Sequence, residues 1–323
     1  MKNNQNKVMT TIACLVLVAA FIAAAVILVT RPADNGEPVT IPAEPETVTE
    51  EATEAETAAE ETAEAEAEAP AEEAAETEAV PAEEETLTAL EKIRKEGKLV
   101  IAMEGAWQPW TYHDESGALT GFDVEVGALI AEGLGVTPEY KETAWDGILA
   151  GVDSGRFDIA CNGVGYTEKR AESYNFSTPY VYTEMVLVVR ADNEEIKTLD
   201  DLKGKKTANS PNSTYAMRSE AAGAEVVYVD TLGETMEMLQ QGRVEATLNA
   251  KDSVDAYLAE HPEAQIKVVL SVAGEPVAIP VQKGERTETL VAEINRILEE
   301  ARQNGKLAEL SNKYFGRDLT KEE

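Results

Sequence analysis

Residues 98–102 read Lys-Leu-Val-Ile-Ala, and residues 123–135 read Asp-Val-Glu-Val-Gly-Ala-Leu-Ile-Ala-Glu-Gly-Leu-Gly. The first stretch is a short apolar run after Gly97, which is typical of a buried strand. In the second, Asp123 is placed to cap a helix and Gly135 to end it. Its apolar residues recur at helical spacing: Val126, Leu129, Ile130 and Leu134. A strand followed by an amphipathic helix is therefore the expected unit of the fold.

The same alternation continues along the chain. Residues 145–152 show a helical pattern, Thr231 and Glu234 have the spacing of a capping box, and a final helix carries an apolar stripe at 290–298 that is expected to pack on the first half of the fold. Strands are expected at 157–160, 185–189, 225–229 and 244–248. This pattern indicates an α/β protein with parallel sheets covered on both faces.

The foldable part is large enough for two lobes. Residues 87–316 make up 230 positions, which is large for one hydrophobic core. A polar break, Arg-Ala-Asp-Asn-Glu-Glu-Ile-Lys, interrupts the pattern at 190–197. The break predicts a second lobe that begins there, and the junction of two lobes is a common place for a small-molecule site.

Residues 1–31 have the features of a membrane anchor or signal segment. No charged residue occurs from Val8 to Thr30, a run of 23 residues that is long enough to cross a bilayer. Lys2 and Lys7 precede it, so the positive-inside rule places the rest of the chain outside the cytoplasm. The residues at 23–25 are three alanines that suit a signal peptidase, but the apolar residues after them favour an uncleaved anchor.

Residues 32–85 are predicted to be a disordered linker. They carry 20 Asp and Glu, no Lys or Arg, and almost no large apolar side chain. Such a segment cannot bury enough surface to offset the entropy of ordering the chain. The linker is expected to tether the folded part near the membrane.

Charge and composition exclude several classes of function. Residues 86–323 keep a net charge of −16 when the +3 of the first segment and the −20 of the linker are removed from the total of −33. The absence of a basic stripe argues against nucleic-acid binding. Two Cys and two His are too few for a disulfide framework or for a Cys- or His-rich metal site. We therefore expect no cofactor and no metal.

Seven short segments occur in a fixed order across the foldable part. They are 117–125 (Gly-Ala-Leu-Thr-Gly-Phe-Asp-Val-Glu), 145–149 (Trp-Asp-Gly-Ile-Leu), 167–170 (Thr-Glu-Lys-Arg), 176–180 (Phe-Ser-Thr-Pro-Tyr), 199–206 (Leu-Asp-Asp-Leu-Lys-Gly-Lys-Lys), 242–246 (Gly-Arg-Val-Glu-Ala) and 313–316 (Lys-Tyr-Phe-Gly). Together they resemble family 3 of the bacterial extracellular solute-binding proteins, the polar amino acid receptors of ABC importers. Residues 104–110 and 313–320 are most similar to the cystine-binding branch.

The resemblance implies a type II periplasmic-binding-protein-like fold, in which two α/β lobes close over a ligand about two hinge crossovers. It places lobe 1 at 86–189 plus 278–323 and lobe 2 at 190–277, with crossovers near 188–191 and 276–280. It also implies a monomeric receptor that captures a small polar amino acid or a related carboxylate. The partner would be a membrane permease with a cytoplasmic ATPase.

The resemblance assigns the ligand's α-carboxylate to Arg170, which ends the Thr-x-x-Arg motif. A guanidinium suits this role because it keeps its charge and matches a planar carboxylate with two hydrogen bonds. The alternative is an exposed Arg on a helix turn. Ser213, at the start of a predicted helix, would offer its hydroxyl and free backbone N–H groups to the same anion, or serve as a plain N-cap.

Aromatic walls and an acid would complete the site. Trp107 and Trp145 match positions where the family presents aromatic rings to the ligand, and an indole face also attracts an ammonium group. Trp110 is expected to pack inside lobe 1. Glu104 aligns with an acid that pairs with the ligand's ammonium, where Asp is the usual residue.

The chain departs from the family pattern at three positions. Gly165 replaces a usual Ser or Thr, Asn212 replaces a usual Gly, and Ala250 replaces an Asp that grips the ammonium from lobe 2. Two of these changes remove polar contacts to an amino group. The residues that would compensate are Asn162, Asn249 or Asp252. Gly163 and Asn162 fit a strand end where the backbone approaches the ligand, or a simple turn.

Two other functions are compatible with the same fold. An enzyme resembling cyclohexadienyl dehydratase would use Glu104 as a general acid. A ligand-sensing module would transmit lobe closure through the anchor helix. Transport is the main expectation, and no catalytic residue is assigned.

Overall fold

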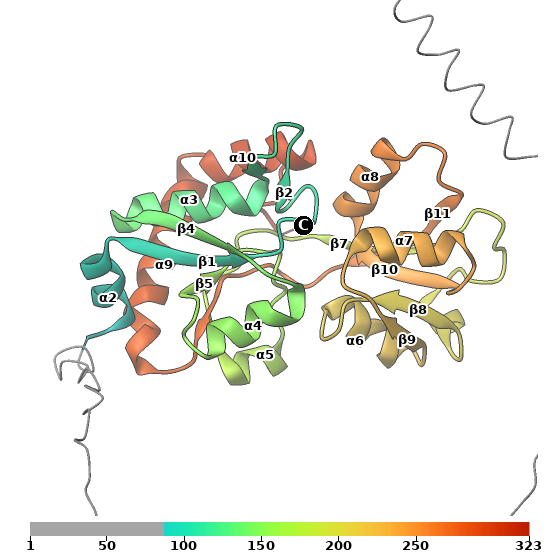
Figure 1. Ribbon diagram of the computed structural model, residues 1–323, viewed down its shortest axis with the longest axis horizontal. Coiled ribbons are helices and arrows are strands. Elements are labelled where there is room, and N and C mark those ends of the chain that lie inside the picture. The colour runs from blue at the N-terminus through green and yellow to red at the C-terminus, as the bar shows by residue number, and fades with distance from the viewer. Residues whose placement is uncertain (1–86, 323) are drawn as a thin grey trace, which may run out of the picture. The chain divides into compact units, whose positions relative to one another are not determined.

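The structure, a computed structural model, describes residues 87–322 (Figure 1). The predicted anchor at residues 1–31 and linker at 32–85 lie outside the described residues. Within residues 87–322, no helix is both long and apolar enough to span a membrane. The described chain forms two α/β lobes, each built on a five-stranded sheet.

The first lobe combines residues from both ends of the described chain. Its elements are β1 (Lys98–Met103), β2 (Tyr112–His113), β3 (Leu119–Thr120), β4 (Thr137–Glu142), β5 (Ile159–Ala160), β6 (Tyr174–Phe176), β12 (Pro280–Gln282), α2 (Ala89–Glu96), α3 (Phe122–Leu134), α4 (Trp145–Asp153), α5 (Glu168–Ser173), η3 (Glu285–Thr287), α9 (Glu288–Gln303) and α10 (Lys306–Phe315). The strand order of its sheet is β4-β1-β5-β12-β6. The expected return of the final helices to the first lobe is confirmed.

Strand β1 shows why both faces of this sheet are covered. Its side chains alternate between the faces, as the period of a strand requires. Leu99, Ile101 and Met103 pack with the residues of α2, α3, α9 and α10. Ala102 packs on the other face with Ile148 of α4. Helices α3 and α4 accordingly lie on opposite sides of the sheet in Figure 1.

The second lobe repeats this layered arrangement. Its elements are β7 (Glu184–Arg190), η2 (Leu199–Leu202), β8 (Lys206–Asn209), α6 (Thr214–Ala221), β9 (Glu225–Tyr228), α7 (Leu232–Gln240), β10 (Ala246–Ala250), α8 (Lys251–Glu260) and β11 (Ile266–Ala273), with strand order β11-β7-β10-β8-β9. Val186 and Val188 of β7 pack with α7 and α8. Leu187 packs on the opposite face with Leu202. Residues 185–189 of β7 are uniformly apolar, and both faces of the strand are buried there.

The expectation of parallel sheets is wrong in part, because both sheets are mixed. Strand β1 pairs in parallel with β4 and β5, and β8 pairs in parallel with β9 and β10. In contrast, β12 is antiparallel to β5 and β6, and β7 is antiparallel to β10 and β11. The antiparallel strands lie next to the segments that pass from one sheet to the other. No helix lies in these segments, and a helical crossover is what lets the next strand run parallel to the last.

Two segments connect the lobes and pair with each other. The Tyr180 N–H donates to the Val277 carbonyl and the Val277 N–H to the Val181 carbonyl, both at 2.9 Å. The first segment lies between β6 and β7, so the chain changes sheets before Glu184 and ahead of the boundary expected at residues 189 and 190. The polar break at 190–197 marks the end of a buried strand instead. The second segment overlaps the expected one at 276–280.

Asp123 does not cap α3, contrary to the sequence prediction. The N-cap residue is Gly121, with a φ of 131°. A Cβ at this position would lie 2.2 Å from the carbonyl oxygen of Trp110, so the close approach of the chain requires glycine. Asp123 is fully buried in the first turn of α3, and its carboxylate accepts the backbone N–H of Gly163, just after β5.

Candidate functional site

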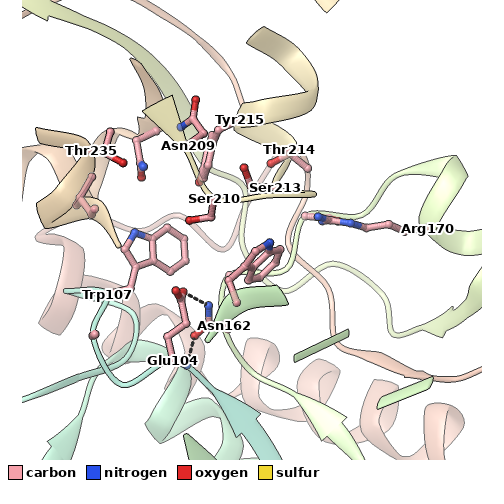
Figure 2. Close-up of a pocket in the computed structure, with 16 residues that line it drawn as sticks. Glu104, Trp107, Asn162, Arg170, Asn209, Ser210, Ser213, Thr214, Tyr215 and Thr235 are labelled. Carbon is pink, nitrogen blue, oxygen red and sulfur yellow. Dashed lines mark hydrogen bonds between the residues drawn. The ribbon is translucent and has the colours of Figure 1, made fainter. Parts of the chain in front are cut away.

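A cavity lies between the two lobes and contains the residues expected to bind a ligand (Figure 2). It encloses about 570 Å³, part of which is open solvent. Nine of the ten predicted site residues line it: Glu104, Trp107, Trp145, Asn162, Gly163, Gly165, Arg170, Ser213 and Asn249. The structure thus brings these residues together, while their roles in binding remain predictions.

Strand ends supply much of the cavity wall. Glu104 follows β1, Asn162 follows β5, Ser210 follows β8, and Asn249 lies at the end of β10. In an open α/β sheet, ligands bind beyond the carboxyl ends of the strands because side chains of neighbouring strands converge there. The opposed strand ends of the two sheets therefore form one site.

Arg170 is buried beneath this cavity, with 7% of its surface exposed, so the alternative of a surface residue is wrong. Its Nη1 donates to the Gly165 carbonyl at 2.8 Å, and its Nη2 donates to the Asn212 carbonyl at 2.9 Å. The guanidinium carbon lies 5.5 Å from the centre of the Trp145 ring. Burial lowers the pKa of Arg170, yet an arginine keeps its charge under physiological conditions. Since a guanidinium has five N–H donors, this cation keeps donors beyond the two that are used.

Asn212 is the one predicted residue that does not line the cavity. It takes part through its backbone, whose carbonyl reaches Arg170 from the other lobe. Its φ of 59° lies in the left-handed region, which Gly and Asn tolerate best. The replacement of the family's usual Gly by Asn therefore preserves the backbone conformation that aims this carbonyl at the guanidinium.

Glu104 is held by an ordered set of hydrogen bonds. Asn162 donates through Nδ2 to Glu104 Oε2 at 2.6 Å, and its Oδ1 accepts the Glu104 N–H at 2.8 Å. The Thr111 hydroxyl also donates to Asn162 Oδ1, at 3.0 Å. Burial raises the pKa of Glu104 to about 7, although the Asn162 bond opposes this change. This carboxyl group is therefore poised between its neutral and charged forms near neutral pH.

Gly163 allows an aromatic wall to lie against the end of β5. Its φ is 57°, and an added Cβ would lie 2.6 Å from the Trp107 ring. The Trp107 ring stacks on Trp110, with centroids 5.4 Å apart. Trp110 is 1% exposed, as expected for a residue that packs in the first lobe. Gly163 is therefore required here by the Trp107 ring, and an approach of its backbone to a ligand stays a prediction.

The buried Asp123 holds this strand end in place. Its Oδ2 accepts the Gly163 N–H at 2.5 Å, and its Oδ1 accepts the Tyr180 hydroxyl at 2.7 Å. Burial raises the pKa of Asp123 to about 7, and the two hydrogen bonds oppose this effect. Asp123 therefore positions the cavity floor from beneath and does not face the cavity itself.

Gly165 meets the second lobe too closely for a side chain. An added Cβ would lie 2.9 Å from Cβ of Glu275 and 3.3 Å from the Thr214 side chain. The hydroxyl side chain that the resemblance implies here would clash in this arrangement. The Gly165 carbonyl instead accepts from Arg170.

The wall from the second lobe is polar and uncharged. Ser213 caps α6 by accepting the Ala216 N–H at 3.0 Å, which confirms the N-cap interpretation. The N–H of Ser213 itself donates to the Ser210 carbonyl at 3.2 Å. Asn209 donates to the Leu248 carbonyl at 2.7 Å, and Asn249 accepts the Ala250 N–H at 2.9 Å. Among the described residues that line the cavity, the charged ones are Glu104 and Arg170.

Asp252 does not compensate for the Asp that Ala250 replaces. It is 7% exposed, lies outside the cavity lining, and pairs with Arg317 Nη2 at 3.2 Å. Several lining residues were missed from the sequence: Ala106, Asn209, Ser210, Thr214, Tyr215, Leu232 and Thr235. Asn209 and Ser210 had a usable signal, because these two polar residues stand at the end of β8 and directly after it.

Comparison with known proteins agrees with this arrangement. A model of the bacterial extracellular solute-binding proteins, family 3, matches residues 99–317. A probable amino-acid ABC transporter-binding protein of Haemophilus influenzae is 39% identical over 231 residues, which cover 71% of this chain and 89% of the relative. The L-cystine-binding protein TcyA of Bacillus subtilis is 38% identical over 230 residues, with coverage of 71% and 85%. The solved structure of an ancestral arginine-binding protein bound to arginine matches with a TM-score of 0.64 and 35% identity, and covers 68% of this chain and 99% of its own.

Proposed function

We propose that this chain, which belongs to family 3 of the bacterial extracellular solute-binding proteins, captures an amino acid between its lobes and presents it to an ABC importer. The observation that carries the proposal is the presence of one cationic and one anionic side chain in the lining of the same cavity. Arg170 supplies the buried positive charge and Glu104 the negative one. A zwitterionic ligand has complementary charges for both.

In this proposal the ligand's carboxylate binds at Arg170. The guanidinium already donates to carbonyls of both lobes, so an anion placed there also links the lobes. The ammonium binds at Glu104, and the indole of Trp107 covers the ligand from the same lobe. A ligand that contacts both lobes stabilises the closed arrangement, and a permease distinguishes that shape from the open one.

L-cystine is the leading candidate among amino acids. The support is the name of TcyA, an L-cystine-binding protein that shares 38% identity with this chain. The second lobe offers amide and hydroxyl groups and no charged residue among its described lining residues, which favours a neutral ligand over a cationic one.

The receptor acts outside the cytoplasm, as members of its family do. We propose that residues 8–30 anchor it there as an uncleaved helix and that it works as a monomer. Membrane fractionation of the full chain tests the anchor, since the protein should remain with membranes after a carbonate wash. Recovery of a soluble protein lacking these residues would show cleavage instead.

Binding, rather than catalysis, is the activity of this family. A buried carboxyl group with a pKa near 7 also suits a general acid, which is why the dehydratase alternative names Glu104. An assay with prephenate or arogenate distinguishes the two functions. A receptor returns either compound unchanged.

Substitution of Arg170 tests the assignment of the carboxylate site. We expect Arg170→Ala in the purified full chain to weaken binding of L-cystine at least about 30-fold, because losing one partner of a buried ionic hydrogen bond costs about 2 kcal/mol or more. Calorimetry measures the change. Arg243→Ala, at an exposed position of the second lobe, is the matched control. Equal affinities of wild type and Arg170→Ala would refute the assignment.

A further inference from the structure

A ligand's ammonium group needs more oxygen acceptors than Glu104 alone offers. It has three N–H donors, and each of them needs an acceptor once the group leaves water. Glu104 is the acid of the first lobe, and its Oε2 already accepts from Asn162 Nδ2 at 2.6 Å. Among the described lining residues of the second lobe, none is charged. Any side-chain acceptor that this lobe supplies is therefore a neutral oxygen.

The amide oxygens of the second-lobe wall are already engaged. Asn249 Oδ1 accepts the Ala250 N–H at 2.9 Å, so the group that this side chain has left for a ligand is its NH2, a donor. Asn209 is 1% exposed, and its Nδ2 donates to the Leu248 carbonyl at 2.7 Å. Its Oδ1 lies 3.5 Å from the Ser219 hydroxyl, inside the lobe. These amides do not suit an ammonium.

Most hydroxyl groups of the same wall are also engaged. The hydroxyls of Ser213 and Thr235 bond to backbone groups of their own helices at 3.0 and 3.1 Å, and that of Ser210 lies 3.4 Å from a backbone carbonyl. Thr214 lies against Gly165, whose carbonyl accepts from the guanidinium. Thr214 is therefore at the end of the cavity where the carboxylate is proposed to bind.

Tyr215 presents a hydroxyl that has no partner among the described residues. It is the second residue of α6, its ring packs in the second lobe, and Figure 2 shows it on the wall that this lobe supplies. Its oxygen is not among the described polar atoms that are both unpartnered and closed off from solvent. Burial, with the nearby carboxylates of Glu275 and Asp252, raises the pKa of Tyr215, so the phenol stays neutral at neutral pH. Its oxygen is available to accept a hydrogen bond from a ligand.

We propose that Tyr215 determines specificity for an amino group: its hydroxyl oxygen accepts an N–H of the ligand's ammonium from the second lobe, while Glu104 accepts from the first. This inference rests on the proposed function. It adds the second-lobe partner of the ammonium, which the charges of the cavity alone do not identify. Because a phenol is uncharged, the contact favours a ligand with an amino group and adds no further negative charge to the cavity.

Position 250 lies on the same face of the sheet as Tyr215. Side chains alternate along a strand, so Ala250 at the end of β10 points to the same face as Leu248. Leu248 and Met185, the residue opposite Ala250 on β7, belong to the apolar cluster against which Tyr215 packs. Ala250→Asp would therefore place a carboxylate on the face that carries the hydroxyl, at the cavity end of the strand.

The hydroxyl can be removed without removing the ring. Tyr215→Phe keeps the aromatic side chain that packs in the second lobe. Tyr228→Phe is the matched control, because Tyr228 is 55% exposed on β9 of the same lobe and lies outside the cavity lining. The probes are L-cystine and dithiodipropionate, which has the same two carboxylates and the same disulfide link but no amino group.

Calorimetry on the full chain measures both probes, with competition against L-cystine for the weaker one. We expect the wild type to bind L-cystine at least about tenfold more tightly than dithiodipropionate. Tyr215→Phe should weaken L-cystine binding about tenfold, because a hydrogen bond to a charged group is lost, and change dithiodipropionate binding less than about twofold. Tyr228→Phe should change neither.

Rescue by a carboxylate gives a second measurement. Ala250→Asp in the Tyr215→Phe protein should recover at least about threefold of the L-cystine affinity, and the same gain for dithiodipropionate would contradict an ammonium contact. Unchanged L-cystine binding in Tyr215→Phe, or an equal loss for both probes, would overturn the assignment of Tyr215. Failure of the wild type to bind either probe would instead refute the proposed function.

Discussion

At the scale of single residues, Glu104 makes the cavity between the lobes sensitive to pH. Its carboxyl group is buried, receives one side-chain hydrogen bond from Asn162, and has a pKa raised to about 7. An ammonium placed beside it favours the charged form and lowers this pKa. Ligand binding would then release a proton from Glu104 whenever the pH is near or below 7.

Affinity should therefore rise with pH. Below about pH 7 the neutral carboxyl must lose its proton to pair with an ammonium, so affinity should increase up to about tenfold per pH unit and level off above about pH 8. Calorimetry between pH 5.5 and about 8.5 checks this slope. Glu104→Gln should flatten it, and Glu142→Gln, on an exposed residue of the same lobe, should preserve it. An identical slope in Glu104→Gln would contradict the assignment of the proton.

At the scale of secondary structure, helix α7 contributes its first turn to the cavity between the lobes. Leu232, its first residue, and Thr235, one turn later, line this cavity. The helix start is fixed by a capping box, in which Thr231 accepts the Glu234 N–H at 3.2 Å and Glu234 accepts the Thr231 N–H at 3.1 Å. The sequence prediction of this capping box is confirmed.

Loss of the cap should weaken the protein measurably. Thr231→Ala is expected to lower the free energy of unfolding by about 1 kcal/mol, because a helix N–H loses its side-chain acceptor. Urea denaturation followed by circular dichroism measures this change. Thr231→Ser keeps the acceptor and should restore most of the stability. The capping account fails if the Ser and Ala variants are equally stable.

At the scale of the whole molecule, the chain's final segment connects the lobes. Arg317 follows α10 of the first lobe, and its Nη1 lies 2.6 Å from Glu184 Oε1 at the start of β7. Its Nη2 lies 3.2 Å from Asp252 Oδ1 in α8. Asp252 is largely buried, so this cation compensates a carboxylate that would otherwise lack a partner of opposite charge.

Removal of this cation should favour separation of the lobes. We expect Arg317→Ala to weaken ligand binding about threefold or more, because a contact between the lobes is lost, and to increase the radius of gyration of the ligand-free protein. Small-angle scattering and calorimetry measure the two effects. Lys321→Ala removes a cation that pairs with Asp318 in the same segment and should change neither quantity. If Arg317→Ala gives the same scattering profile as the wild type, this contact does not hold the lobes together.

Local patterns predicted the elements better than the way they are joined. The helices at 122–134 and 145–153 and the buried strand at 184–190 follow directly from apolar periodicity. Periodicity carries no information on strand direction, so the mixed sheets were missed. The resemblance brought Arg170 and Glu104 to one site, but Asn212 acts through its carbonyl, and a backbone contact leaves no side-chain signal in a sequence.

A buried cation that loses an anion usually passes through a costly state without a partner. The carbonyl of Asn212, 2.9 Å from the Arg170 Nη2, accepts one N–H from the opposite lobe, and the guanidinium has further donors for a ligand. The two contacts can therefore be made together. When a carboxylate departs, the cation retains one backbone acceptor in each lobe, which lowers the energy of the emptied site.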